Sequence, residues 1–175
     1  HSSAASDVYK RQRWSDGDIF DTEDIDFWWN DNVQDANVAS RLPKDALGAG
    51  TTLEILGPYS FKFNFDEPKG NAVLAQLAYM GGAPGPSHVM KPLHPAHNSD
   101  ATYESYANGM PASVLPIVTL GAYVPVVHKV DELMVMKRNP YYWKVDEECN
   151  QLPYYNETIY KLSLIHISEP TRRSY

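Results

Sequence analysis

Near the start of the chain, hydrophobic residues recur with the period of a helix. The residues that share one predicted helix face are Ile25, Trp28, Trp29 and Val33. We therefore predict a helix over residues 22–33, with Asp21 as its N-cap and Asp24 in the capping-box position. Because Trp28 and Trp29 are adjacent, they should point in different directions. We expect one to pack in the core and the other to reach a flank or a cleft.

Further along, aromatic residues occupy alternate positions, which is the pattern of a half-buried β-strand. They are Tyr59, Phe61, Phe63 and Phe65. The turn pair Gly57-Pro58 separates them from a short apolar run at residues 53–55, so the two runs predict a β-hairpin. Residues 71–80 have apolar side chains at helical spacing and predict a short amphipathic helix.

The second half of the chain is less regular. Residues 88–98 are rich in Pro and His and should form an irregular loop, whereas residues 114–127 are apolar and interrupted by Pro and Gly. Residues 133–138 alternate again, and Asn139-Pro140 ends this predicted strand. Helices and strands thus mix without a strict βαβ order, which indicates a mixed α/β or α+β fold with undetermined strand pairing.

Composition narrows the function classes. The chain has 22 Asp and Glu against 15 Lys and Arg, a net charge of −7, and the acidic excess grows when both terminal segments are left out. Such a chain repels phosphate backbones, so we do not expect nucleic-acid binding. An aromatic content of 12% argues for a globular protein. The single cysteine, Cys149, cannot form an internal disulfide and is interpreted as an ordinary loop thiol.

Candidate chemical sites are few. The acidic residues of positions 16–26 lack the ligand spacing of a calcium loop. His94 and His97 resemble a metal pair without further ligands nearby, and together with His88 and His128 we interpret them as surface histidines. No nucleophile, catalytic base or carboxylate pair stands in a catalytic motif. We therefore expect no enzyme activity, no cofactor and no metal.

Both ends of the chain have unusual sequences. Residues 2–12 and 162–172 have the sequences expected from translated sequencing-library adapter DNA. The antisense of one codon choice for residues 7–12 translates as residues 162–167, a coincidence that two unrelated protein segments would not share. We therefore expect residues 1–12 and 162–175 to be adapter-derived, and residues 13–161 to be an internal piece of a longer gene product.

Several motifs resemble one protein family. Asn139 begins the sequence NPYYWKVD, and Asn150 begins NQLPY, as in the family 5 extracellular solute-binding proteins of bacterial ABC transporters. The other matches follow in the family's order. They are WSDG at residues 14–17 with Phe20 and the helix after it, the strand at 61–65 with Pro68, PSH at 86–88, and LGAYVP at 120–125. Departures are Thr22, one residue later than the usual Thr, Cys149 where Gly is common, and Tyr155-Asn156 after LPY.

The resemblance implies an incomplete fragment of a two-lobed periplasmic-binding-protein type II fold. Residues 13–115 would form the small N-terminal lobe region and residues 116–161 a return into the first large lobe. The implied protein is a monomeric, periplasmic or lipid-anchored receptor that captures a peptide or oligosaccharide and delivers it to an ABC permease. Candidate ligand contacts are Trp28, Trp29 and Tyr123. The alternative is a secreted carbohydrate-binding domain, or part of a carbohydrate-active enzyme, whose aromatic residues form a sugar platform.

Overall fold

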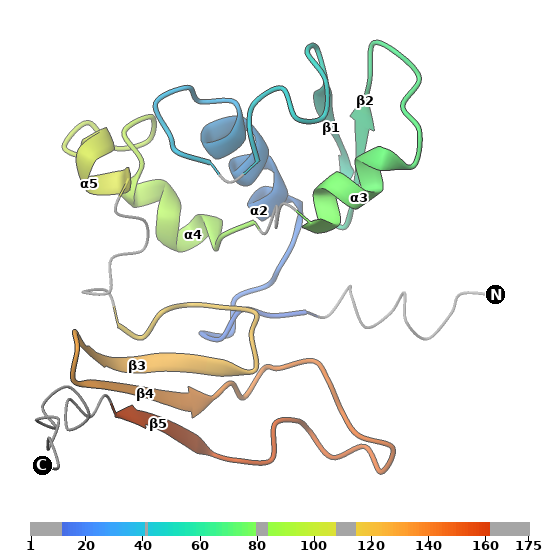
Figure 1. Ribbon diagram of the computed structural model, residues 1–175. Helices are drawn as coiled ribbons and strands as arrows, with labels where there is room; N and C mark the ends of the chain where they lie inside the picture. Colours follow the sequence, from blue (N-terminus) through green and yellow to red (C-terminus); the bar gives the residue numbers. More distant parts are fainter. Residues whose placement is uncertain (1–11, 41, 80–83, 108–114, 162–175) are drawn as a thin grey trace, which may run out of the picture.

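The computed structural model describes residues 12–40, 42–79, 84–107 and 115–161. The terminal segments that we expect to be adapter-derived lie outside the described residues, apart from Gln12. The described chain forms two parts (Figure 1). One is a helical part that also carries a β-hairpin, and the other is a three-stranded antiparallel sheet. The segment leading into the first helix passes between them.

The first helix confirms the prediction for residues 22–33 and its cap. It consists of α2 (Thr22–Phe27), an α-helix, followed without a break by η1 (Trp28–Val33), a π-helix. The Asp21 side chain accepts a hydrogen bond from the backbone N–H of Glu23, and the reciprocal capping-box bonds with Asp24 are present. The hydrophobic spacing did not reveal the change from α- to π-helix.

The π-helix carries the core of the helical part. The buried cluster contains Trp28, Trp29, Val33, Leu42 and Leu47. Trp28 is 8% exposed and Trp29 is 1% exposed, so the expectation that one of them would leave the core is wrong. The wider turn of a π-helix changes the angular spacing that the α-helical argument assumed, and both indoles pack in one cluster.

The predicted hairpin is confirmed as β1 (Thr52–Gly57) and β2 (Ser60–Asn64), which pair antiparallel. Its aromatic face is only partly covered. Phe63 and Phe65 pack against the core, but Tyr59 and Phe61 are exposed. The predicted amphipathic helix is α3 (Ala72–Tyr79), with Val73 and Leu77 against the core.

The Pro- and His-rich stretch is more regular than we predicted. It contains the short helix α4 (Ser87–Met90) and the 3-10 helix η2 (Lys91–Leu93), and α5 (Tyr103–Ala107) follows. The expectation of an irregular loop over residues 88–98 is therefore wrong for its first half. Pro is tolerated in the first turn of a helix, because the N–H that it lacks has no partner there.

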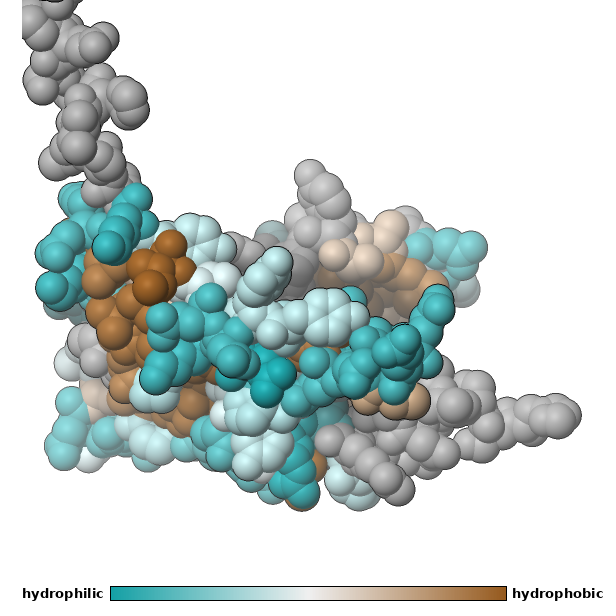
Figure 2. Space-filling model, turned by 90° about the horizontal axis from the view of Figure 1, so that it is seen from below, coloured by the Kyte–Doolittle hydropathy of each residue, from teal (hydrophilic) through white to brown (hydrophobic). Residues whose placement is uncertain are grey.

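The sheet consists of β3 (Tyr123–Lys129), β4 (Leu133–Arg138) and β5 (Glu157–Lys161), in the order β3-β4-β5. The strand predicted at residues 133–138 is confirmed, whereas β5 was not foreseen. Large hydrophobic side chains in and beside the sheet remain exposed, among them Val130 after β3 and Ile159 in β5. Figure 2, seen from below, shows a hydrophobic area beside mostly hydrophilic surface. In the described part of the chain, no helix is long and apolar enough to cross a membrane.

Candidate functional site

The polar turn at residues 13–19 connects the helical part with the sheet, and we call it the joint turn. Its ends are bridged by Arg13 and Ile19. Towards the sheet, the Ser15 backbone N–H donates to the carbonyl of Thr119 at 3.0 Å, and the Thr119 N–H donates to Ser15 Oγ at 3.1 Å. Gly17 at the bend has a φ of +97°, a conformation that suits glycine.

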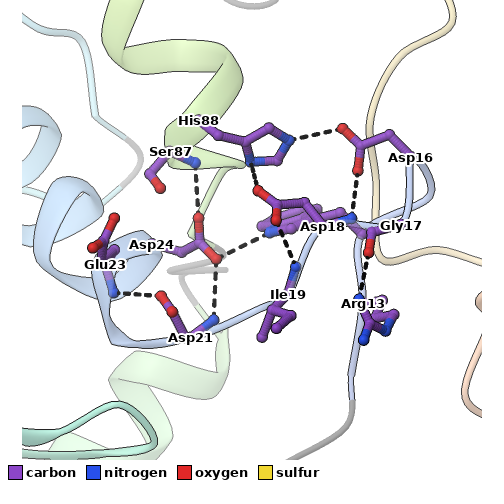
Figure 3. Close-up of polar contacts among 11 residues, drawn as sticks. Arg13, Asp16, Gly17, Asp18, Ile19, Asp21, Glu23, Asp24, Ser87 and His88 are labelled. Carbon is purple, nitrogen blue, oxygen red and sulfur yellow. Dashed lines mark hydrogen bonds and ion pairs between the residues drawn. The ribbon is translucent and has the colours of Figure 1, made fainter.

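Towards the helical part, the joint turn is attached through the buried carboxylate of Asp24. This carboxylate accepts hydrogen bonds from Trp14 Nε1 at 2.9 Å, from the Asp21 N–H at 3.3 Å and from the Ser87 N–H at 2.8 Å (Figure 3). Both oxygens are therefore satisfied although the residue is 2% exposed. Asp24 thereby links the joint turn, the start of α2 and the start of α4.

A second attachment runs through His88 on α4. Its Nε2 lies 2.7 Å from Asp16 Oδ2 and its Nδ1 lies 3.1 Å from Asp18 Oδ2, both in the joint turn (Figure 3). Burial acts to raise the pKa of Asp16, but hydrogen bonds from His88 and from the Asp18 backbone outweigh it and lower the pKa. The ring of His88 thus bridges two carboxylates.

These contacts explain the acidic cluster. Asp21 caps α2, Asp24 accepts three hydrogen bonds, and Asp16 and Asp18 hold His88. Among the described residues, no group of three or more His, Cys, Asp or Glu side chains is arranged to hold a metal ion. The acidic side chains nearest the joint turn therefore serve internal polar contacts.

His94 contradicts the prediction of surface histidines, because it is fully buried. Its ring packs edge-on against Tyr106, Tyr103 and Phe27. Its Nε2 lies 3.1 Å from the carbonyl oxygen of Asp31, and its Nδ1 accepts the N–H of Ala96 at 3.1 Å. Periodicity could not find this position, since His94 lies just after η2 and also contacts Phe27 and Asp31, which are far away in the sequence.

The other histidines of this stretch are more accessible. His97 is partly exposed, with its Nε2 3.0 Å from a carboxylate oxygen of Asp31. His88 is also partly exposed. The motif PSH, which the family resemblance singled out, was the one sequence signal that pointed to a role for His88.

Two tyrosines behind His94 complete this polar cluster. Tyr103 donates to the Asp35 carboxylate at 2.7 Å, and Tyr106 donates to the side chain of Asn32. Burial acts to raise the pKa of Asp35, but the Tyr103 and Asn37 hydrogen bonds outweigh it and lower the pKa. Burial raises the pKa of Tyr106 to about 12.

The three candidate ligand contacts are not brought together into one site. Trp28 and Trp29 lie in the hydrophobic core of the helical part. Tyr123 is the first residue of β3, pairs with Arg138 on β4, and is half-buried. Trp28 and Trp29 thus pack in the core, whereas the side chain of Tyr123 remains partly accessible.

The NPYYWKVD and NQLPY motifs form a braced loop after β4. Asn139 is fully buried, where it donates to the Gly121 carbonyl at 2.8 Å and accepts the Tyr141 N–H at 2.8 Å. Asp146 accepts hydrogen bonds from Asn150 and from the Tyr154 hydroxyl, which lower its pKa. The loop presents exposed aromatic side chains, namely Tyr141, Trp143, Tyr154 and Tyr155.

Comparison with known proteins identifies the family. Residues 10–167 match the sequence model described as "Bacterial extracellular solute-binding proteins, family 5 Middle". The chain is 45% identical over 153 residues to the periplasmic alpha-galactoside-binding protein of Rhizobium meliloti (strain 1021), an alignment that covers 86% of this chain and 22% of that protein.

Solved structures agree with this match. The periplasmic binding protein MelB of Agrobacterium fabrum C58, in complex with stachyose, has a TM-score of 0.79 and 41% identity over 87% of this chain and 23% of its own. An oligopeptide-binding protein, OppA, has a TM-score of 0.72 and 29% identity over 86% of this chain and 26% of its own. The chain thus spans about a quarter of the length of these relatives and shares part of their type II periplasmic-binding-protein fold. It belongs to the family 5 extracellular solute-binding proteins of bacteria.

Proposed function

We propose that this chain is part of the substrate-binding component of an ABC transporter that captures an oligosaccharide and delivers it to a membrane permease. The observation that carries the proposal is the ranking of the relatives by their sequence identity to this chain. The alpha-galactoside-binding protein and the protein solved with stachyose are 45% and 41% identical to this chain, whereas the oligopeptide-binding protein is 29% identical. An α-galactoside is therefore the favoured ligand class, and a peptide is the alternative.

The proposal includes the setting of the protein. Two of the named relatives are described as periplasmic, so we place the whole protein in the periplasm or, as a lipoprotein, at the cell surface. We propose that it acts as a monomer, without catalysis, and that it does not bind nucleic acid. A net charge of −7 supports the last point, because clustered positive charge drives binding to phosphate backbones.

Tyr123 is the ligand contact that we retain from the three candidates. Its half-buried side chain can offer an aromatic face to a sugar ring, whereas Trp29 is 1% exposed and has no free face. Tyr123 is also the first residue of β3. The backbone just before it is held by a hydrogen bond, because the N–H of the buried Asn139 donates to the Ala122 carbonyl at 2.9 Å.

A chimera tests the proposal. Residues 13–161 would replace the matching segment of the stachyose-bound relative, and calorimetry would measure binding of stachyose and of an oligopeptide. We expect saturable stachyose binding, and we expect Tyr123→Ala to weaken it while Trp143→Ala does not. A folded chimera that binds the peptide and not stachyose would refute the oligosaccharide assignment.

The same titration on the 175-residue chain addresses the alternative of a stand-alone carbohydrate-binding domain. The exposed aromatic side chains of the loop after β4 favour that alternative. It requires saturable sugar binding by the chain itself, lost on Trp143→Ala or Tyr154→Ala. The receptor proposal requires a cleft with two walls, so it predicts no saturation with this chain alone.

A further inference from the structure

The segment at residues 87–98 is attached at both ends through histidine side chains, and the two attachments have opposite proton requirements. His88 in α4 contacts the joint turn, and His94 after η2 contacts the carbonyl of Asp31 in η1. The hydrogen-bonding partners of the two rings define which protons each ring carries.

His88 needs both of its ring protons. Its two nitrogens face carboxylate oxygens of Asp16 and Asp18, at 2.7 and 3.1 Å, and an ionised carboxylate only accepts hydrogen bonds. Both nitrogens must therefore donate, which only the imidazolium form can do. Loss of one proton would place a nitrogen lone pair against a carboxylate and release one side of the bridge.

His94 needs to be neutral. Its Nδ1 accepts the N–H of Ala96 at 3.1 Å, so this nitrogen cannot carry a proton. Nε2 then carries the ring proton and donates to the Asp31 carbonyl at 3.1 Å. A second proton on Nδ1 would face the Ala96 N–H directly and break that contact inside a fully buried site.

The charged groups around each ring are already engaged. Near His94, the Asp31 carboxylate contacts His97 at 3.0 Å, and the Asp35 carboxylate, 4.0 Å from Nε2, accepts the hydroxyl of Tyr103. The rings of Phe27, Tyr106 and His97 also face His94.

Near His88, the charged groups other than Asp16 and Asp18 also make hydrogen bonds of their own. Arg13 donates to the Gly17 carbonyl, and Asp24 holds the Ser87 N–H. A carboxylate that accepts a hydrogen bond keeps its negative charge, so Asp35 would partly offset a charge on His94. The contact that a second ring proton on His94 would break is the one with the Ala96 N–H.

We propose that the segment at residues 87–98 is a pH-sensitive element, seated on the joint turn and on η1 only while His88 is protonated and His94 is neutral. Rising pH deprotonates His88 and frees the α4 end. Falling pH protonates His94 and frees the other end.

The contacts that hold this segment in place extend beyond the two histidine rings. The Ser87 N–H is bonded to Asp24, which also holds Trp14 of the joint turn. Loosening at His88 therefore reaches the connection between the helical part and the sheet. In this way pH would act on how the two parts of the chain are held together.

Imidazole ¹⁵N NMR on the unaltered 175-residue chain is the first test, because it reads ring protons directly. At neutral pH we expect His88 with both nitrogens protonated and His94 with Nε2 protonated and Nδ1 free. A neutral His88, or a His94 protonated on Nδ1, in the folded chain would overturn the proposal.

Amide hydrogen exchange between pH 5 and 8, corrected for intrinsic rates, is the second test. We expect protection of Ala96 and Asn98 to fall by about tenfold on the acid side, and of Ser87 and Val89 by about as much on the alkaline side, as for the loss of one hydrogen bond.

Matched variants assign each side of that profile. His94→Asn keeps an acceptor for the Ala96 N–H without a titrating proton and should abolish the acid loss alone. His88→Lys keeps a positive charge and should abolish the alkaline loss alone. His128→Gln on β3 is the control and should change neither. Unchanged profiles in both histidine variants would refute the proposal.

Discussion

Trp14 donates its indole N–H to the carboxylate of Asp24 at 2.9 Å, and both side chains are buried. The bond joins the first residue of the WSDG motif to the first turn of α2, ten residues later. Trp14 therefore contributes a hydrogen bond to the buried site as well as hydrophobic packing.

Removing that donor should destabilise the chain. Trp14→Phe keeps an aromatic ring but leaves Asp24 with one hydrogen bond fewer in a buried site, so we expect a loss of about 1–3 kcal/mol in the free energy of unfolding. Urea denaturation followed by circular dichroism measures it. Trp143→Phe, at an exposed position, is the control and should cost less than about 1 kcal/mol. Equal effects of the two variants would contradict the role of the Trp14–Asp24 bond.

Gly17 is the second residue of the joint turn that we expect to resist substitution. Its φ is +97°, and a Cβ built on it would lie 2.9 Å from the hydroxyl oxygen of Tyr141. Gly17→Ala should therefore cost about 1–3 kcal/mol through the backbone conformation and the contact. The melting temperature of the variant measures the loss.

Gly57→Ala is the matched control for Gly17. No heavy atom lies within 4 Å of a Cβ built at Gly57, and its φ is not among the positive values. We expect a change of less than about 0.5 kcal/mol there. A double variant with Tyr141→Ala separates the two causes, because it removes the contact and leaves the backbone conformation.

Local patterns were sufficient for part of the fold. The cap at Asp21, the hairpin around Gly57 and the strand before Asn139 follow from interactions within a few residues, and the structure confirms them. The burial of His94 and the pairing of β5 depend on residues far away in the sequence, which no local period encodes. The family motifs predicted the family, but they could not show that the acidic side chains near the joint turn hold His88.

Trp29 tests the distinction between core and ligand contact. It is 1% exposed and its ring lies 4.9 Å from that of Phe63. Trp29→Ala should cost about 3–5 kcal/mol, or abolish cooperative unfolding of the helical part. Leu74→Ala on α3 is the control, because Leu74 is 68% exposed and should cost little. A Trp29→Ala chain with unchanged unfolding would show that the residue does not hold the core.

Tyr106 should make the helical part sensitive to alkali. Burial raises the pKa of its hydroxyl to about 12, above the ordinary value of about 10. A group whose pKa is raised on folding stabilises the fold fully below the unfolded value, and this stabilisation is lost as the pH rises through the folded value. We therefore expect the free energy of unfolding to decline between about pH 10 and 12.

Tyr106→Phe identifies that contribution. The variant should unfold with a weaker dependence on pH in this range, and ultraviolet titration should show one late-ionising tyrosine fewer. Tyr155→Phe, at a highly exposed position, is the control and should leave the late step in place. Persistence of the late step in Tyr106→Phe would assign it to another tyrosine.

Cys149 occupies a position whose backbone favours glycine. Its φ is +66°, in the left-handed region that glycine adopts easily and where a residue with a Cβ is strained. Cys149→Gly should raise the free energy of unfolding by roughly 1 kcal/mol, reduced by the greater freedom of glycine in the unfolded chain. Thermal unfolding under reducing conditions measures the gain without disulfide-linked dimers.

Cys149→Val is the matched comparison, because a β-branched side chain is least tolerant of positive φ, and it should lower the melting temperature. If Cys149→Gly and Cys149→Val shifted the melting temperature in the same direction, backbone strain would not be the cause.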